Sequence, residues 1–334
     1  MGFLCLWGAS FTVKADDTLS ITGAGATFPY PLYSKWFSEF HKINPKVEIN
    51  YQSIGSGGGI RQLLENTIDF GASDAPMKDE QLKKAKIPVL HFPMVLGAVV
   101  LTYNLPGISE PIRLTPEVLA DLFLGKIYYW NDAKIQTLNP DIKLPDVPVM
   151  IVHRSDGSGT TAVFTDYLCK VSEEWKKRVG SGTAVKWPIG LGGKGNEGVT
   201  GFVKNSPGAL GYVELLYAEK NKLSVALLKN SSGEYVKPEA SSITKAAEGA
   251  LKLIPKDFRV SITNPPGKGA YPISSFTYLL IYQTMTQAKA KSMKAFVSWA
   301  YDEGQKLASQ MYYAPLPKAL LTKTKDQIKE LKTP

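Results

Sequence analysis

The chain has 334 residues, 44% of them hydrophobic and 21% charged, which is typical of a globular protein with room for two domains. Its 39 Lys and Arg residues outnumber 30 Asp and Glu, and the resulting net charge of +9 favours an anionic partner. The lysines are scattered, and there is no zinc-finger spacing, RNA-binding aromatic motif or dense arginine run, so we expect no nucleic-acid partner.

Residues 1–15 are predicted to be an export signal. The apolar run from Phe3 to Val13 is too short to span a bilayer, and Val13-x-Ala15 fits the small-residue rule for signal cleavage. The positively charged region that normally precedes such a run is missing, which is consistent with a truncated signal. The mature chain would keep Cys169 as its single cysteine, and we expect an exported, soluble protein.

Residues 18–76 carry the alternating pattern of a βαβαβ unit. In such sheets, ligands bind at the loops beyond the carboxyl ends of the strands. The predicted elements are a strand over Leu19–Ile21, a helix over Pro29–Lys42, a strand over Val47–Tyr51, a helix over Gly59–Asn66 and a strand over Ile68–Ala72.

Two long apolar runs, His91–Tyr103 and Ser274–Tyr282, are predicted to be paired crossover strands that form a hinge. The segment between them, residues 97–272, would make a second lobe. Residues 16–96 and 273–334 would together make the first lobe.

Three glycine-rich segments each precede a predicted helix, and they are Gly23–Pro29, Ser53–Gly59 and His153–Thr160. In the third, Ser158 is the predicted N-cap of a helix over residues 159–170, and Arg154 can add charged donors to its unpaired first-turn N–H groups. A helix N-terminus of this kind binds phosphate-like anions. The alternative is a set of ordinary turns and a capped helix with a surface Arg–Asp pair.

Asp74 follows the strand that ends at Ala72, so we expect it to face the same cleft as the glycine-rich segments. A carboxylate suits an anion that carries a proton, which phosphate does near neutral pH, with its second ionisation at about 6 to 7, and sulfate does not. The alternative for Asp74 is a turn or N-cap role before Pro76.

Five stretches of the sequence resemble the periplasmic phosphate-binding proteins of bacterial ABC uptake systems. The resemblance runs from about residue 19 to the C-terminus, and the stretches occur in the same order. They are Thr22–Pro29, Gly55–Gly58, Asp69–Pro76, Arg154–Thr160 and Lys186–Asn196.

The resemblance implies a type II periplasmic binding protein fold, in which two α/β lobes joined by two hinge strands close over a phosphate ion. It also implies a set of ligand groups, with no catalytic residue, no metal and no cofactor. Asp156 would orient Arg154, and the phosphate-binding residues would be Thr27, Phe28, Ser56, Asp74, Arg154, Ser158, Gly159 and Thr160.

The implied function is high-affinity binding of inorganic phosphate in the periplasm and its delivery, by a monomer, to the permease subunits of an ABC transporter. Two departures from the family pattern, Gly57 in place of a frequent second serine and His153 before Arg154, remove no ligand group. A phosphate-binding phosphatase and an extracellular adhesin or matrix protein are the alternative functions.

Other motifs are weaker. Gly190–Gly195 fits the dinucleotide fingerprint, but Trp187-Pro188 is a poor strand end and the fingerprint needs its own βαβ context, so we expect no dinucleotide site. The family resemblance implies a structural loop there. Gly71–Ala75 approaches the nucleophile elbow of serine hydrolases, and Ser158 could be proposed as a nucleophile. His41, His91 and His153 are the only histidines. The first two are placed on a helix and a hinge strand, and Arg154 would disfavour protonation of the third, so we expect no catalytic triad and no metal site.

Overall fold

The computed structural model describes residues 18–333, so the predicted signal peptide lies outside the described residues. The fold is mixed α/β, as predicted. Its large sheet has the strand order β2-β1-β3-β12-β4-β8-β6-β7, with β9 paired to β4. These strands are β1 (Leu19–Gly25), β2 (Val47–Ser53), β3 (Phe70–Ser73), β4 (Val89–Tyr103), β6 (Met150–Arg154), β7 (Leu191–Gly193), β8 (Ala209–Glu214), β9 (Ser224–Val225) and β12 (Ser274–Tyr282).

A small second sheet lies in the part of the chain between β4 and β12, with the order β11-β10-β5. Its strands are β5 (Arg113–Leu114), β10 (Leu227–Lys229) and β11 (Tyr235–Val236). The helices are α1 (Tyr30–Ile43), α2 (Ser56–Leu64), α3 (Asp79–Leu82), α4 (Pro116–Phe123), α5 (Ala133–Leu138), α6 (Gly159–Val171), α7 (Glu173–Arg178), α8 (Gly195–Asn205), α9 (Leu215–Lys220), α10 (Ala240–Ala250), α11 (Gln287–Trp299), α12 (Gln305–Gln310) and α13 (Lys318–Gln327).

The predicted βαβαβ order of the N-terminal region is confirmed, with β1 parallel to both β2 and β3. Pro29 precedes α1, and Trp36 and Phe40 are buried on one face of that helix, as its apolar spacing predicts. Helix α2 differs from the prediction because it begins at Ser56, three residues before the predicted start. The glycines that argue against helix on propensity therefore form its first turn.

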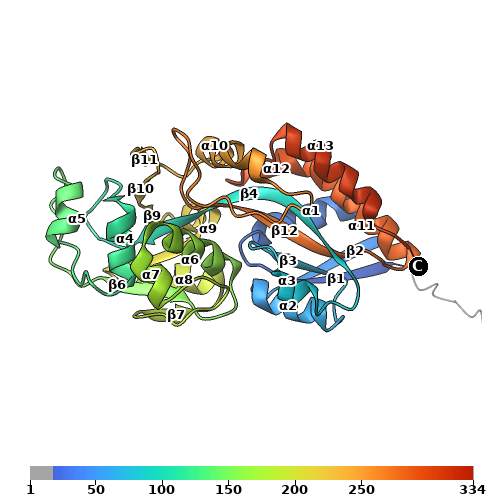
Figure 1. Cartoon of the computed structure of the whole chain (residues 1–334), viewed down its shortest axis with the longest axis horizontal. Coiled ribbons are helices and arrows are strands. Elements are labelled where there is room, and N and C mark those ends of the chain that lie inside the picture. The colour runs from blue at the N-terminus through green and yellow to red at the C-terminus, as the bar shows by residue number, and fades with distance from the viewer. Residues whose placement is uncertain (1–17, 334) are drawn as a thin grey trace, which may run out of the picture.

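The two predicted crossover strands, β4 and β12, pair antiparallel over Val89–Ala98 of β4. From Val99 onward β4 pairs with β8 instead, so the partner changes within one strand. Figure 1 shows β4 and β12 running between the elements of the first lobe and those of the second. The fold is thus two α/β lobes joined by two strands, and the exact lobe boundaries stay a prediction.

The second lobe is arranged around β6, which is parallel to β7 on one side and to β8 on the other. Helix α6 follows β6 directly, and its predicted N-cap is confirmed because Ser158 Oγ accepts the N–H of Thr161 at 3.0 Å. Within residues 18–333, no helix is both long and apolar enough to cross a membrane.

Candidate functional site

The carboxyl ends of β1, β3 and β6 bring the predicted site residues to the junction of the two lobes. Gly159, the first residue of α6, lies so close to the first lobe that a Cβ atom there would be 2.3 Å from Ser56 Oγ and 2.5 Å from Asp74 Oδ2. The N–H of Gly57 donates to the carbonyl oxygen of Gly157 at 2.8 Å across the junction. Glycine is needed at position 159 because a side chain there would hold the lobes apart.

Two helix N-termini face each other at this junction. Ser56 is the first residue of α2, while Gly159 and Thr160 open α6. First-turn N–H groups have no acceptor within their own helix and carry a partial positive charge. The side chains of Ser56 and Thr160 are fully buried, so the hydroxyl groups add donors that water cannot reach. Such an arrangement of donors suits an anion.

Thr27 and Phe28 follow β1, and tyrosine hydroxyls from elsewhere in the chain fix their backbone. The Tyr217 hydroxyl donates to the Thr27 carbonyl at 2.6 Å, and the Tyr313 hydroxyl donates to the Phe28 carbonyl at 2.6 Å. In a trans peptide the N–H of Phe28 points away from the Thr27 carbonyl. Tyr217 therefore sets the direction in which Phe28 offers its N–H group.

Arg154 ends β6, with 3% of its surface exposed, and is held in one orientation by Asp156. Its Nε and Nη2 donate to Oδ1 and Oδ2 of Asp156 at 2.7 and 2.5 Å, a bidentate pair. Asp156 Oδ1 also accepts the N–H of Gly195 at 3.0 Å. Burial would raise the pKa of Asp156, but the hydrogen bonds and charge of Arg154 outweigh it and lower that pKa. Asp156 therefore stays ionised and holds the Arg154 guanidinium in one orientation.

Asp74 supplies the acceptor at the junction. Its side chain is 1% exposed, Oδ1 accepts the hydroxyl of Thr277 at 3.0 Å, and Oδ2 is buried with no partner among the described residues. Burial raises its pKa to about 7, although the Thr277 hydrogen bond and the Arg154 charge act in the opposite direction. The carboxyl group thus can hold or release a proton near neutral pH. The turn or N-cap alternative has no support here.

Asn196, near the N-terminus of α8, joins these residues although sequence reasoning gave it no role. Its side chain is fully buried, and Nδ2 donates to Oγ1 of Thr27 at 2.6 Å and to Oγ1 of Thr160 at 3.3 Å. The Lys186–Asn196 stretch contributed to the family resemblance only. A polar residue beside glycines at a helix start was the signal that could have found it.

The prediction of a loop over Gly190–Gly195 is wrong, because Leu191–Gly193 form β7 and α8 begins at Gly195. The segment lies in a β7-α8-β8 unit, so it has the strand-helix-strand context of a dinucleotide site, but its glycines and N–H groups do not suit one. Two glycines of the fingerprint precede or occupy the strand rather than follow it. The first N–H groups of α8, which would bind a pyrophosphate, donate to Asp156 and Thr27 instead.

The histidines all have structural partners. His41 Nδ1 lies 2.8 Å from the Val47 carbonyl, and His91, in β4, accepts the N–H of Met77 at 3.0 Å while burial lowers its pKa to about 4. His153 stacks on Trp187, with ring centroids 4.7 Å apart. Burial, rather than the neighbouring Arg154, lowers the pKa of His153, which corrects the expected cause.

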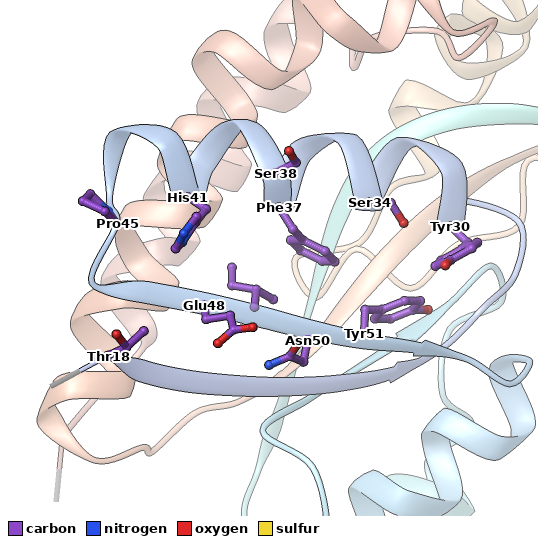
Figure 2. Close-up of a pocket in the computed structure, with 11 residues that line it drawn as sticks. Thr18, Tyr30, Ser34, Phe37, Ser38, His41, Pro45, Glu48, Asn50 and Tyr51 are labelled. Atoms are coloured by element: carbon purple, nitrogen blue, oxygen red, sulfur yellow. The ribbon is translucent and has the colours of Figure 1, made fainter. Parts of the chain in front are cut away.

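Two cavities help to place the site. One of about 230 Å³ lies beside it, lined by both lobes, including Asp74 and Ser275 from the first and Val163 from the second. A larger cavity of about 600 Å³ lies beside α1 and β2, and its lining includes His41 of α1 and Glu48 of β2 (Figure 2). The residues that line this larger cavity include the carboxylate of Glu48 and no Lys or Arg, so the cavity does not suit an anion.

Comparison with known proteins gives the family. Residues 12–303 match the PBP superfamily domain. The chain is 49% identical over 313 residues to the phosphate-binding protein PstS of Xylella fastidiosa, covering 93% of this chain and 85% of the relative. It is 44% identical over 324 residues to the phosphate-binding protein PstS of Haemophilus influenzae, covering 96% of both.

Solved structures agree on the fold. A periplasmic phosphate-binding protein called PfluDING, solved with bound phosphate, superposes with a TM-score of 0.72 at 21% identity, over 92% of this chain and 94% of that one. A phosphate-binding protein of Stenotrophomonas maltophilia gives 0.70 at 20% identity, over 93% and 94%. With the identities to the curated relatives, these matches show that the chain belongs to the PstS family of phosphate-binding proteins within the PBP superfamily.

Proposed function

We propose that the chain binds inorganic phosphate in the periplasm and delivers it, as a monomer, to the permease subunits of an ABC importer. The observation that carries this proposal is a buried cluster of donors around one unpartnered carboxylate oxygen, Oδ2 of Asp74. The names of the relatives, phosphate-binding protein PstS, support the same ligand. Asp156 would hold Arg154 in place. The proposed ligand residues are Thr27, Phe28, Ser56, Asp74, Arg154, Ser158, Gly159 and Thr160.

The balance of donors and acceptors favours phosphate over sulfate. Arg154 and the first-turn N–H groups of the helices can only donate hydrogen bonds, and the buried hydroxyls of Ser56 and Thr160 can add further donors. Asp74 Oδ2 is the acceptor, and it requires a ligand hydrogen when the carboxyl group is ionised. Sulfate has no hydrogen to offer and would meet Asp74 as a repulsive charge.

The proposed mechanism is closure of the two lobes around the ion. Donors from Ser56 and from Gly159 belong to different lobes, so only the closed form offers both sets. Charge-assisted hydrogen bonds contribute roughly 1.5 to 3 kcal/mol each. Several of them reach about −8 kcal/mol, which is micromolar affinity, after the ordering costs are deducted.

The phosphatase alternative has no support, and the chain is a binding protein rather than an enzyme. A serine phosphatase needs a base next to its nucleophile, and Ser158 instead caps α6. The nitrogens His41 Nδ1 and His91 Nε2 are occupied by backbone groups, and His153 Nδ1 lies 3.0 Å from the Arg154 carbonyl. No cluster of metal-ligating side chains occurs within residues 18–333.

Calorimetry on the mature chain with phosphate, sulfate, molybdate and citrate tests this function. We expect micromolar or tighter binding of phosphate and none of comparable strength for the other three. Small-angle scattering should show compaction on adding phosphate, because the ion closes the lobes. Equal binding of sulfate and phosphate would contradict the ligand assignment, and the absence of any anion binding would favour the adhesin or matrix alternative.

A further inference from the structure

Asn196 has a fixed amide orientation. Its side chain is fully buried, and Oδ1 accepts the backbone N–H of Glu214 at 2.9 Å. Since a backbone N–H can only donate, the atom that faces it must be the amide oxygen. Nδ2 therefore points the other way, with both of its hydrogens directed at the lobe junction.

Those two hydrogens meet one hydroxyl from each lobe. Nδ2 lies 2.6 Å from Thr27 Oγ1 and 3.3 Å from Thr160 Oγ1. Thr27 Oγ1 also accepts the backbone N–H of Asn196 at 3.2 Å, and Thr160 Oγ1 accepts from Nη1 of Arg154 at 3.3 Å. Each hydroxyl oxygen thus accepts two hydrogen bonds, which equals its number of lone pairs.

A buried hydroxyl whose lone pairs are both occupied can only donate. We propose that Asn196 is a specificity-determining positioning residue that fixes the Thr27 and Thr160 hydroxyls as donors toward the anion, so that neither hydroxyl competes with Asp74 for the ligand hydrogen. This inference rests on the proposed function. It explains why the Thr27 and Thr160 hydroxyls cannot accept a second hydrogen from the ligand.

Removing the amide changes which protonation state of phosphate binds best. In Asn196→Ala both hydroxyls can rotate and accept a hydrogen, so dihydrogen phosphate loses less affinity than hydrogen phosphate. We expect phosphate affinity to fall about 10-fold at about pH 8 and by less at about pH 5. A purely structural role would lower the affinity by the same factor at both values.

A double-variant cycle with Thr27→Val shows whether Asn196 acts through the Thr27 hydroxyl. If it does, adding Asn196→Ala to Thr27→Val costs clearly less affinity than adding it to the wild type. Thr27→Ser keeps a hydroxyl and should keep the full effect of Asn196→Ala. The matched control is Asn104→Ala, because Nδ2 of Asn104 donates to the carbonyls of Val203 and Lys204 outside the site.

Additive losses in the cycle, or a pH profile that Asn196→Ala leaves unchanged, would overturn the inference while phosphate binding by the wild type stands. A wild-type chain that does not bind phosphate would overturn the proposed function as well. Should Asn196→Ala fail to fold, Asn196→Asp serves instead, since one oxygen can still accept from Glu214. Its other oxygen would draw both hydroxyl hydrogens away, so affinity should fall further and recover at low pH.

Discussion

Thr277 donates its hydroxyl hydrogen to Oδ1 of Asp74 at 3.0 Å, which leaves Oδ2 as the free oxygen of that carboxylate. Thr277 lies in β12, one of the two strands that join the lobes, and its side chain is fully buried. The hydroxyl lowers the pKa of Asp74 against the larger effect of burial. Thr277 therefore helps to keep the Asp74 carboxylate ionised and fixes its orientation.

Replacing Thr277 by Val should raise the pKa of Asp74 above about 7, because burial then acts with less opposition. Phosphate affinity should fall, most strongly near neutral pH, since a protonated Asp74 can no longer accept the ligand hydrogen. An NMR titration of the Asp74 carboxyl carbon measures the first effect and calorimetry the second. Thr324→Val is the control, because Thr324 is a buried threonine whose hydroxyl donates to the Leu321 carbonyl instead. An unchanged Asp74 titration would contradict the role given to Thr277.

Asp74→Asn should relax the rejection of sulfate. The amide presents no charge to sulfate and can donate a hydrogen, so we expect the ratio of phosphate to sulfate affinity to fall by about 10-fold or more. Competition calorimetry with the two anions gives this ratio directly. Asp302→Asn makes the same charge change at an exposed ion pair and should leave the ratio as it was.

Arg154→Ala provides the contrast, since it removes charge attraction that any oxyanion uses. Phosphate and sulfate should weaken together, with the ratio held. A variant of Asp74 that binds weakly but still discriminates as the wild type does would refute its proton-accepting role.

The stability of the ligand-free protein should depend on pH through Asp74. Its pKa is raised from 3.8 to about 7, so the folded state binds a proton that the unfolded state has released between these values. The unfolding free energy of the wild type therefore falls, relative to that of Asp74→Asn, as pH rises through this window. This difference, or gap, between the unfolding free energies of the two proteins should change by about 2 to 3 kcal/mol between about pH 5 and about pH 8. Urea unfolding of both proteins across this range measures it, and a constant gap would show that Asp74 titrates normally.

Gly159→Ala should prevent closure. The added methyl group would lie 2.3 Å from Ser56 Oγ and 2.5 Å from Asp74 Oδ2, so the lobes could not approach as closely. We expect phosphate affinity to fall at least about 100-fold, which corresponds to two or more lost charge-assisted hydrogen bonds. Scattering should show no compaction with phosphate. Gly201→Ala is the control, since a Cβ at this helical glycine of α8 has open space around it, and it should close and bind normally.

Local sequence was enough to predict the parts of the site that lie next to a strand end. Ser158 is the N-cap of α6 because its spacing to the apolar positions of that helix is visible in the sequence. The strand that precedes Asp74 was enough to place Asp74 at the cleft. The start of α2 was not predicted, because the glycines after Ser56 indicate a later start than the one observed. Gly57 approaches the second lobe, where its N–H donates to the Gly157 carbonyl, and Gly59 lies against Ala24 of β1. These close contacts outweigh the low helix propensity of glycine.

The residues that support the ligand groups could not be predicted in the same way. Thr277 is 203 residues from Asp74, and Asn196 is 169 from Thr27, so no periodicity connects them. Thr277 lies inside the apolar run Ser274–Tyr282, whose pattern predicts only a hinge strand. The available signal was chemical, since a hydroxyl inside a fully buried strand must find a partner. Which partner it finds depends on the register of β12 against β3.

Hydrogen bonds also join the lobes directly, without the anion, from Tyr217 to Thr27 and from Gly57 to Gly157. Each contributes about 0.5 to 1.5 kcal/mol, so they raise the resting population of the closed form. A larger closed population lowers the conformational cost that phosphate must meet, but a closed protein admits no ion. These two contacts therefore affect the rates of phosphate exchange as well as the affinity for phosphate. Strengthening them would slow both capture and release, and an importer needs release as much as capture.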